Sequence, residues 1–209
     1  MSIEVELSNV SKRFKRDWVI QQLSTVFQPG SRTAILGQNG SGKSTLLKII
    51  TGFVSTTEGE VQWKNDGQFV EPSDWHHFFS YSAPYLELIE EYTLQECLDF
   101  HFSLKQLRQD IELDAILEAS GLQHHKHKQV QNFSSGMKQR LKLILAICSE
   151  VPCYFLDEPC SNLDLDGIEW YKKLVLELPQ DKTIVVASNN EYEYEFCTGF
   201  ISNFKREVS

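Results

Sequence analysis

The sequence predicts an α/β protein with a mostly parallel core sheet, because short apolar strands and amphipathic helices alternate along it. An apolar run over 34–36 leads through a glycine-rich turn into a helix. A second apolar run, 153–156, follows a helical segment over 135–148 and ends at two acids. A third, 183–187, comes after a helical pattern over 167–178. Periodicity therefore separates the core strands by helices.

The N-terminal part differs from the core in its pattern, because its predicted strands follow one another without a helix between them. Residues 3–7 alternate apolar and charged side chains, as a half-exposed strand does. A polar, basic connection is expected over 11–16, and the next strand ends at the turn signal Gln28-Pro29-Gly30. These segments predict an antiparallel N-terminal β subdomain. The strand-like segments outside the core are 3–7, 19–27, 59–63, 68–70 and 78–81.

A helical subdomain is expected over about 85–135. Its pattern turns helical at Thr93, which forms a capping box with Glu96, and a second helix stops at Gly121. A last pair of segments, 191–197 and 199–204, closes the chain. With 209 residues and no low-complexity linker, residues 1–209 are expected to form one domain.

The glycine-rich turn carries the strongest chemical signal. Its glycines allow successive backbone amides to point into one concavity at the start of a helix, where an anion is favoured. Lys43 adds a positive charge for terminal phosphates, and Ser44 offers a hydroxyl to Mg²⁺. The alternative is a glycine-rich turn that merely precedes a helix. The predicted nucleotide-binding residues here are Gly37, Gln38, Asn39, Gly40, Ser41, Gly42, Lys43, Ser44 and Thr45.

Two adjacent acids, Asp157 and Glu158, follow the buried strand 153–156. Open α/β sheets bind ligands at this end of their strands. Asp157 is predicted to hold Mg²⁺, and its neighbour is predicted to orient an attacking water. In isolation, the sequence Asp-Glu-Pro would favour the start of an ordinary turn, but downstream of a phosphate-binding turn the metal-site interpretation is preferred.

Bulk properties exclude several classes of protein. The net charge of -9 argues against a nucleic-acid partner. The five cysteines form no C-x-x-C pair, which indicates buried thiols in a reducing compartment. Residues 1–10 lack the pattern of a secretory signal, and no apolar run approaches 18 residues.

Two further segments complete a pattern. Residues 133–140 (FSSGMKQR) stand at the start of a helix before the acidic strand, and Ser161-Asn-Leu-Asp164 follows the two acids. In this order the motifs resemble the ATP-binding subunit of ATP-binding-cassette (ABC) transporters, over nearly the whole chain. The resemblance implies a P-loop NTPase fold and an ATPase that uses ATP and Mg²⁺.

The resemblance also assigns roles by position. Residues 37–44 look like the Walker A loop, 154–157 like the Walker B strand, and Glu158 like the catalytic glutamate. The signature segment would be Ser134, Ser135, Gly136 and Met137, with Asp164 in the D-loop and Phe14 stacked on adenine. The family forms a head-to-tail dimer, with ATP between one Walker A loop and the other chain's signature.

Two positions depart from the family pattern. Ser82-Ala83-Pro84 stands where a glutamine is expected, and proline offers neither a side-chain ligand nor an N–H donor. Asn189 stands in the place of the switch histidine and is the third predicted catalytic residue, with Lys43 and Glu158. We therefore expect intact ATP binding, with hydrolysis that is slow or dependent on a partner.

The resemblance implies a subunit that powers a separately encoded membrane permease. The residue sequence of the signature segment resembles that of exporter-type subunits more than that of importer-type ones. It would be cytoplasmic and peripheral on the inner face of the cell membrane, paired with itself or a paralogue. Residues 85–89 would either dock onto the permease or pack within the helical subdomain. The alternatives are a soluble ABC ATPase without a membrane role and a nucleotide-gated regulatory partner.

Overall fold

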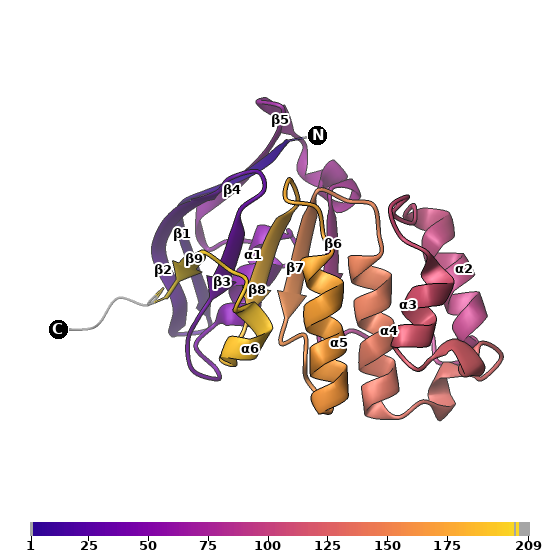
Figure 1. The fold of residues 1–209 in the computed structure, drawn as a ribbon. Coiled ribbons are helices and arrows are strands. Elements are labelled where there is room, and N and C mark those ends of the chain that lie inside the picture. The colour runs from indigo at the N-terminus through magenta and orange to yellow at the C-terminus, as the bar shows by residue number, and fades with distance from the viewer. Residues whose placement is uncertain (1, 203, 205–209) are drawn as a thin grey trace.

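The structure is a computed structural model that describes residues 2–202 and 204. Its helices and strands occur in the alternating order expected of an α/β protein (Figure 1). The strands are β1 (Ile3–Phe14), β2 (Asp17–Phe27), β3 (Arg32–Ile35), β4 (Glu58–Asn65), β5 (Gln68–Val70), β6 (Phe79–Ser82), β7 (Cys153–Asp157), β8 (Thr183–Ala187) and β9 (Gly199–Ile201). The α-helices are α1 (Lys43–Ile50), α2 (Leu94–Leu104), α3 (Leu113–Ala119), α4 (Ser135–Ile147), α5 (Leu165–Leu176) and α6 (Glu191–Tyr194).

The core sheet has five strands in the order β6-β7-β8-β3-β9, and all its pairs are parallel. The predicted mostly parallel core sheet is therefore confirmed. Ala187 of β8 lies opposite Asp157 on one side and Ile35 on the other. This register ends three central strands in one row, so the loops that follow them leave from the same edge.

The second sheet is antiparallel, in the order β2-β1-β4-β5, as predicted for the N-terminal subdomain. The connection predicted over 11–16 was wrong in extent, because β1 continues to Phe14, which pairs with Asp17. Register shifts after Leu7 bend the strand, and the turn falls at Lys15, whose φ is 54°. Polar residues fit here because one face of an antiparallel sheet can remain solvated.

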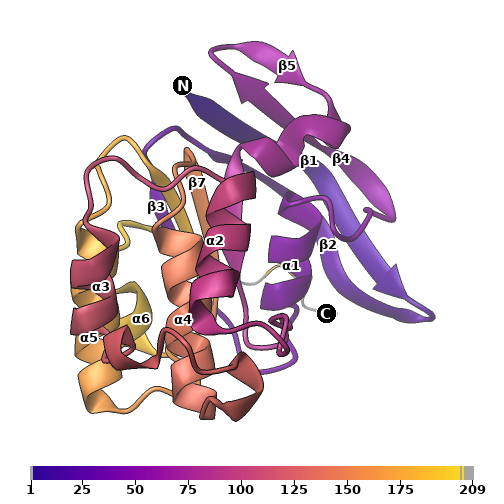
Figure 2. The same ribbon diagram turned by 90° about the vertical axis from the view of Figure 1, so that its right-hand side faces the viewer.

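Two hydrophobic clusters hold these layers together. Helix α1 lies between the two sheets (Figure 2). Its Leu46 belongs to the same hydrophobic cluster as Val5 of β1 and Phe155 of β7. On the other face of the core sheet, α2, α4 and α5 pack against residues such as Tyr154 and Leu156 (Figures 1 and 2). The helix that follows the glycine-rich turn is thus fixed by burial on both sides.

The helical subdomain contains α2 and α3 and lies between β6 and α4 in the chain, as predicted. The two helices predicted between Thr93 and Gly121 are present as α2 and α3, with residues 105–112 between them. Thr93 caps α2 through the predicted capping box with Glu96. The last predicted pair of segments contains α6 and β9, and residue 203 of the second segment lies outside the described residues.

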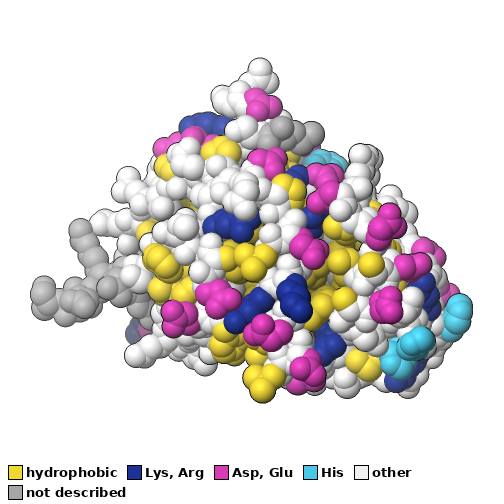
Figure 3. Space-filling model, in the orientation of Figure 1, with side chains coloured by type: hydrophobic (Ala, Val, Ile, Leu, Met, Phe, Trp, Pro, Cys, Tyr) yellow, Lys and Arg dark blue, Asp and Glu magenta, His cyan; other side chains and the backbone are white. Residues whose placement is uncertain are grey.

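Charged side chains of both signs are mixed on the face formed by α4 and α5 (Figure 3). Lys172, for example, pairs with Glu169 and Glu195. Among the described residues, no helix combines the length and apolar character needed to cross a bilayer.

Candidate functional site

Four loops converge at the carboxyl edge of the core sheet. The glycine-rich turn follows β3, the two acids end β7, Asn189 follows β8, and Tyr85 follows β6. A pocket beside Ser44 is lined by Pro84, Tyr85, Asp157 and Glu158. The structure therefore brings the predicted loop and the predicted acids together.

The glycine-rich turn has a backbone that only glycine adopts readily. Gly42, the N-cap of α1, has a φ of 106°, and a Cβ atom there would lie 2.4 Å from Val19 Cγ1. Gly37 has a φ of 152°, and its Cβ would lie 2.6 Å from Ser41 Oγ. No side chain in the described part of the chain caps the start of α1. Its first amides therefore remain available to an anion.

Lys43 is buried with its ammonium inside this turn. Its Nζ donates to the carbonyls of Gly37 at 2.6 Å and Gln38 at 3.3 Å, and to Asn189 Oδ1 at 3.2 Å. Asn189 Nδ2 in turn donates to Asn39 Oδ1 at 2.8 Å. Two of the three predicted catalytic residues, Lys43 and Asn189, are thus in direct contact across the sheet edge.

Asp157 is buried, with 1% of its surface exposed. Its Oδ2 accepts a hydrogen bond from the Tyr85 hydroxyl at 2.9 Å, whereas Oδ1 lacks a well-aligned partner among the described residues. Burial raises the pKa of this carboxyl, and hydrogen bonding from the Ser44 and Tyr85 hydroxyls opposes that rise. A cation at Oδ1 would relieve the cost of burying this charge.

The residues predicted to hold a metal ion fit Mg²⁺. The Ser44 hydroxyl lies beside the Asp157 carboxylate, and both are hard oxygen donors of the kind this cation prefers. Oδ1 of Asp157 is buried without a well-aligned partner among the described residues, so it is available to a cation.

Glu158 stands in the left-handed region with a φ of 43°, which is uncommon for a residue with a side chain. Its N–H donates to the Ala187 carbonyl at 2.9 Å, and its carbonyl accepts from Ser161 N–H at 3.0 Å. These bonds hold the strained turn against β8. Strain of this kind is concentrated at functional sites.

Glu158 also joins two neighbouring pockets. One contains Asp157, and the other is formed by the glycine-rich turn together with Phe14 and Val19. Phe14 is 46% exposed at the end of β1, with the Lys12 ammonium 5.0 Å from the centroid of its ring, and the exposed part of the ring can contact a planar ligand. The second pocket is lined by Phe14, Val19, Asn39, Gly40, Gly42, Lys43, Ser44, Thr45 and Glu158.

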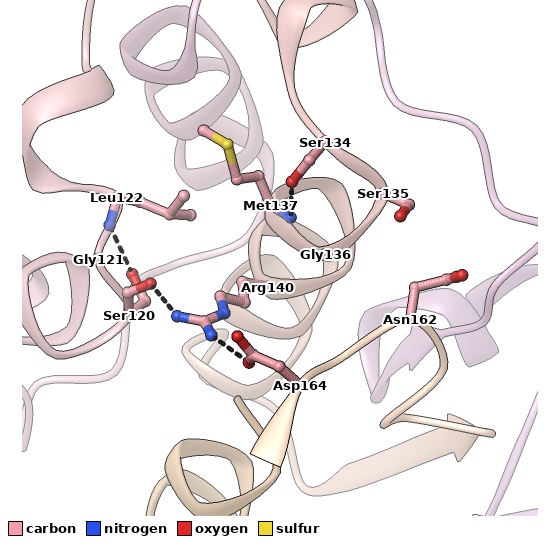
Figure 4. A pocket seen from close by; sticks show the side chains of 10 residues that line it. All are labelled: Ser120, Gly121, Leu122, Ser134, Ser135, Gly136, Met137, Arg140, Asn162 and Asp164. Atoms are coloured by element: carbon pink, nitrogen blue, oxygen red, sulfur yellow. Dashed lines mark hydrogen bonds and ion pairs between the residues drawn. The ribbon is translucent and has the colours of Figure 1, made fainter. Parts of the chain in front are cut away.

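The predicted signature residues lie elsewhere, around the start of α4 (Figure 4). Ser134 is the N-cap, and its hydroxyl accepts from Met137 N–H at 3.2 Å. A Cβ on Gly136 would lie 3.0 Å from the Asn162 carbonyl oxygen, so a larger residue would require this backbone to shift by a few tenths of an ångström. The pocket is lined by Ser120, Gly121, Leu122, Ser134, Ser135, Gly136, Met137, Arg140, Asn162 and Asp164.

Asp164 forms the far wall of this pocket and is the N-cap of α5. Its Oδ1 accepts from Gly167 N–H at 2.9 Å and from Arg140 Nη2 at 2.8 Å. The Gly167 bond and the Arg140 guanidinium lower the pKa of this carboxyl. Arg140 Nη1 also donates to the Ser120 carbonyl at 2.7 Å, so one guanidinium links α3, α4 and α5 (Figure 4).

Sequence reasoning missed three side chains at these sites: Tyr85, Arg140 and Glu193. Tyr85 was predicted only as part of the segment 85–89, which would dock onto a permease or pack within the helical subdomain, although it follows β6 on the edge where ligands bind. Glu193 is buried and accepts from Cys160 N–H at 2.7 Å and from the Ser188 hydroxyl. It therefore ties the segment after Glu158 to the residue before Asn189. No local motif signals such a contact.

The chain is similar to known proteins over most of its length. The model of the ABC transporter family matches residues 20–161. An uncharacterized ABC transporter ATP-binding protein of Haemophilus influenzae is 30% identical over 192 residues, which cover 90% of this chain and 77% of the relative. The cytochrome c biogenesis ATP-binding export protein CcmA of the same species is 29% identical over 189 residues, with 90% and 89% covered.

A solved structure of an ATP-binding subunit of an ABC transporter is also similar. It aligns with a TM-score of 0.82 and 26% identity over 95% of this chain and 85% of that one. The parallel sheet, the antiparallel sheet and the helical subdomain are therefore those of a P-loop NTPase. The chain belongs to the ABC transporter family, among its ATP-binding proteins, which are ATPases.

Proposed function

We propose that this chain binds Mg-ATP on its glycine-rich turn and pairs head to tail with a second ABC ATPase subunit, either its own copy or a paralogue. The pair would drive a separately encoded membrane permease of the exporter type. In this cycle ATP closes the pair and hydrolysis reopens it, which is a population shift driven by a ligand.

The observation that carries this proposal is the meeting of Ser44 and Asp157. One comes from the turn after β3 and the other from the end of β7, and they lie side by side at the sheet edge. Asp157 keeps one buried oxygen without a well-aligned partner among the described residues. A triphosphate cradle with a metal-binding acid beside it is the arrangement that phosphoryl transfer requires.

Each residue has a role in this proposal. The amides of residues 37–45 and the Lys43 ammonium bind the phosphates, and Phe14 stacks on the adenine. Ser44 and Asp157 hold Mg²⁺, which supplies charge neutralisation at the phosphate oxygens. Glu158 orients the attacking water and accepts its proton. Asn189 donates a hydrogen bond to the terminal phosphate from its amide.

Pairing of two subunits is supported by the separation of the two candidate pockets. The pocket of the glycine-rich turn and the pocket of the signature residues share no lining residue. The signature pocket nevertheless presents a capped helix start, with Ser135 exposed at its first position. A second copy could place this helix start, together with Asp164, on the ATP bound by the first.

A membrane partner is supported by relatives and by the surface. The CcmA relative is named an ATP-binding export protein. Beside the site, the side chains of Tyr85, Leu86 and Ile89 are between 36% and 45% exposed. Exposed apolar residues that lie together favour contact with another protein. Such a partner would keep the chain cytoplasmic, on the inner face of the membrane.

The test combines nucleotide binding, turnover and co-purification. ATP binding in equilibrium dialysis and phosphate release are expected for the purified chain, with turnover below that of family members that carry both the glutamine and the histidine. Co-expression with a multi-span protein from a neighbouring gene should yield a detergent-stable complex.

The other readings predict different results. A soluble ABC ATPase would release phosphate but remain free of any membrane protein. A nucleotide-gated regulator, which Pro84 and Asn189 favour, would bind ATP without releasing phosphate. Ordinary family-level turnover by the isolated subunit would refute the slow-hydrolysis part of the proposal.

A further inference from the structure

Two tyrosines stand at the end of β6, beside Asp157. Tyr81 lies opposite Phe155 in the parallel register of β6 and β7, so the chain that follows β6 runs beside the end of β7. Tyr85 reaches back from this segment and donates its hydroxyl to Asp157 Oδ2 at 2.9 Å. The two tyrosine hydroxyls are also hydrogen-bonded to each other.

The direction of these bonds follows from counting protons. A phenol has one proton to donate, and an ionised carboxylate can only accept. Because Tyr85 gives its proton to Asp157, its oxygen must accept from Tyr81. Burial raises the pKa of both phenols, so both remain protonated donors. The bonds therefore run from Tyr81 to Tyr85 to Asp157.

The rings are held in place by other contacts. The Lys48 ammonium, from the helix that begins at the glycine-rich turn, lies 3.9 Å from the centroid of the Tyr85 ring. The Tyr81 ring packs edge to face on Phe53, with 5.5 Å between centroids. The Tyr85 hydroxyl is thus a positioned donor although the residue is 45% exposed.

The consequence for Asp157 is an unequal use of its two oxygens. Oδ2 is occupied by the Tyr85 hydroxyl, and Oδ1 is buried without a well-aligned partner among the described residues. Without the Tyr85 bond, the Ser44 hydroxyl would be the remaining hydrogen-bond donor described for this carboxylate, which would be less restrained against rotation. With it, Oδ1 keeps a fixed position in the pocket that also contains Ser44.

We propose that Tyr85, supported by Tyr81, is a positioning residue for the metal of Mg-ATP, because it fixes Asp157 with one oxygen left for the cation. The inference rests on the proposed function, since it requires that Mg-ATP binds here. It also gives the segment after β6 a role at the site, although Pro84 itself offers no side-chain ligand. The phenol acts one residue later, through the acid.

The test separates metal positioning from nucleotide binding. ATP affinity is measured by equilibrium dialysis of radiolabelled ATP, once with Mg²⁺ and once with EDTA, in a Glu158→Gln background that limits hydrolysis. The ratio of the two affinities reports the contribution of the metal. Tyr85→Phe should lower this ratio about tenfold or more, as loss of a hydrogen bond to a metal ligand does. ATP affinity in EDTA should change less than about twofold.

Two further variants make the result decisive. Tyr81→Phe should lower the ratio less than Tyr85→Phe, because the direct bond to Asp157 remains. Tyr92→Phe, which removes a hydroxyl in the helical subdomain, should leave the ratio unchanged. An unaltered ratio in Tyr85→Phe, or equal losses with and without Mg²⁺, would overturn the inference. If the parent protein binds no ATP under either condition, the proposed function itself fails.

Discussion

The pocket of the glycine-rich turn and the pocket of the signature residues are both built at helix starts, but they differ in how much of their chemistry is buried. In the first, Lys43 is 4% exposed, and Asp157, in the adjoining pocket that shares Ser44 and Glu158 with it, is 1% exposed. In the second, Ser134, Ser135 and Asp164 are exposed. The charged groups of the first pocket are held by hydrogen bonds within the chain, whereas the second pocket exposes its polar groups to solvent or to a partner.

This difference indicates which parts of the proposed site one chain can prepare alone. Buried charges must be paired or ligand-bound, so their positions are fixed by the fold. Exposed hydroxyls and amides are solvated and cost little when left open. A second subunit could therefore complete the signature pocket without any rearrangement of the glycine-rich turn.

The largest effect is expected from Glu158→Gln. Loss of a general base lowers the rate of hydrolysis by about 10² to 10⁴, while ATP binding and pairing should persist because neither pocket is dismantled. Phosphate release and light scattering in the presence of ATP measure these effects. A variant that stays strictly monomeric with ATP would count against a nucleotide-bridged pair.

Lys43→Ala should weaken ATP binding by on the order of 100-fold, the loss expected for a buried hydrogen bond to a charged group. It removes the ammonium that bonds to Gly37, Gln38 and Asn189. Lys173→Ala, on the exposed side of α5, is the matched control. Equal ATP affinities in the two variants would place the nucleotide elsewhere.

Ser135→Glu tests the second pocket, the one formed by the signature residues. An acid in the first turn favours the α4 helix, so the monomer should fold, but it repels phosphate brought by a second subunit. We expect ATP-dependent pairing at least about tenfold weaker, with monomer ATP affinity changed less than about twofold. Ser135→Ala controls for loss of the hydroxyl. Undiminished pairing of Ser135→Glu, measured by analytical ultracentrifugation, would exclude this face from the interface.

The smallest effect is expected at Glu193, which connects Cys160, after Glu158, with Ser188, before Asn189, and so supports the site of the glycine-rich turn. Burial raises its pKa above the ordinary 4.5, so the folded state favours the protonated form more than the unfolded state does. Its stabilising contribution is therefore complete below that value and is lost as the pH rises through the folded pKa.

Glu193→Gln should remove this loss, which amounts to at most about 1.4 kcal/mol per pH unit. Urea unfolding at several pH values measures it, with the exposed Glu191→Gln as control. The free energy of unfolding of Glu193→Gln should still decrease somewhat as the pH rises, because burial also raises the pKa of Asp157. Parallel stability curves for all three proteins would show that Glu193 does not titrate differently on folding.

The sequence determined the features that depend on neighbouring residues. The strand, glycine-rich turn and helix around Lys43, the capping box at Thr93 and the helix start at Ser134 are local patterns, and the structure confirms them. The antiparallel segments were also predictable, but not the length of β1. Register shifts carry it through a basic stretch to Phe14, and only pairing with β2 and β4 decides this.

Only the tertiary structure decided which distant side chains meet. Tyr85 and Asp157 are 72 positions apart in the chain, and Lys43 and Asn189 are 146 apart. Such pairs form because the order β6-β7-β8-β3 aligns the ends of strands that the sequence alone leaves unordered. Periodicity specifies an element and its buried face, whereas strand order and register depend on contacts across the whole core.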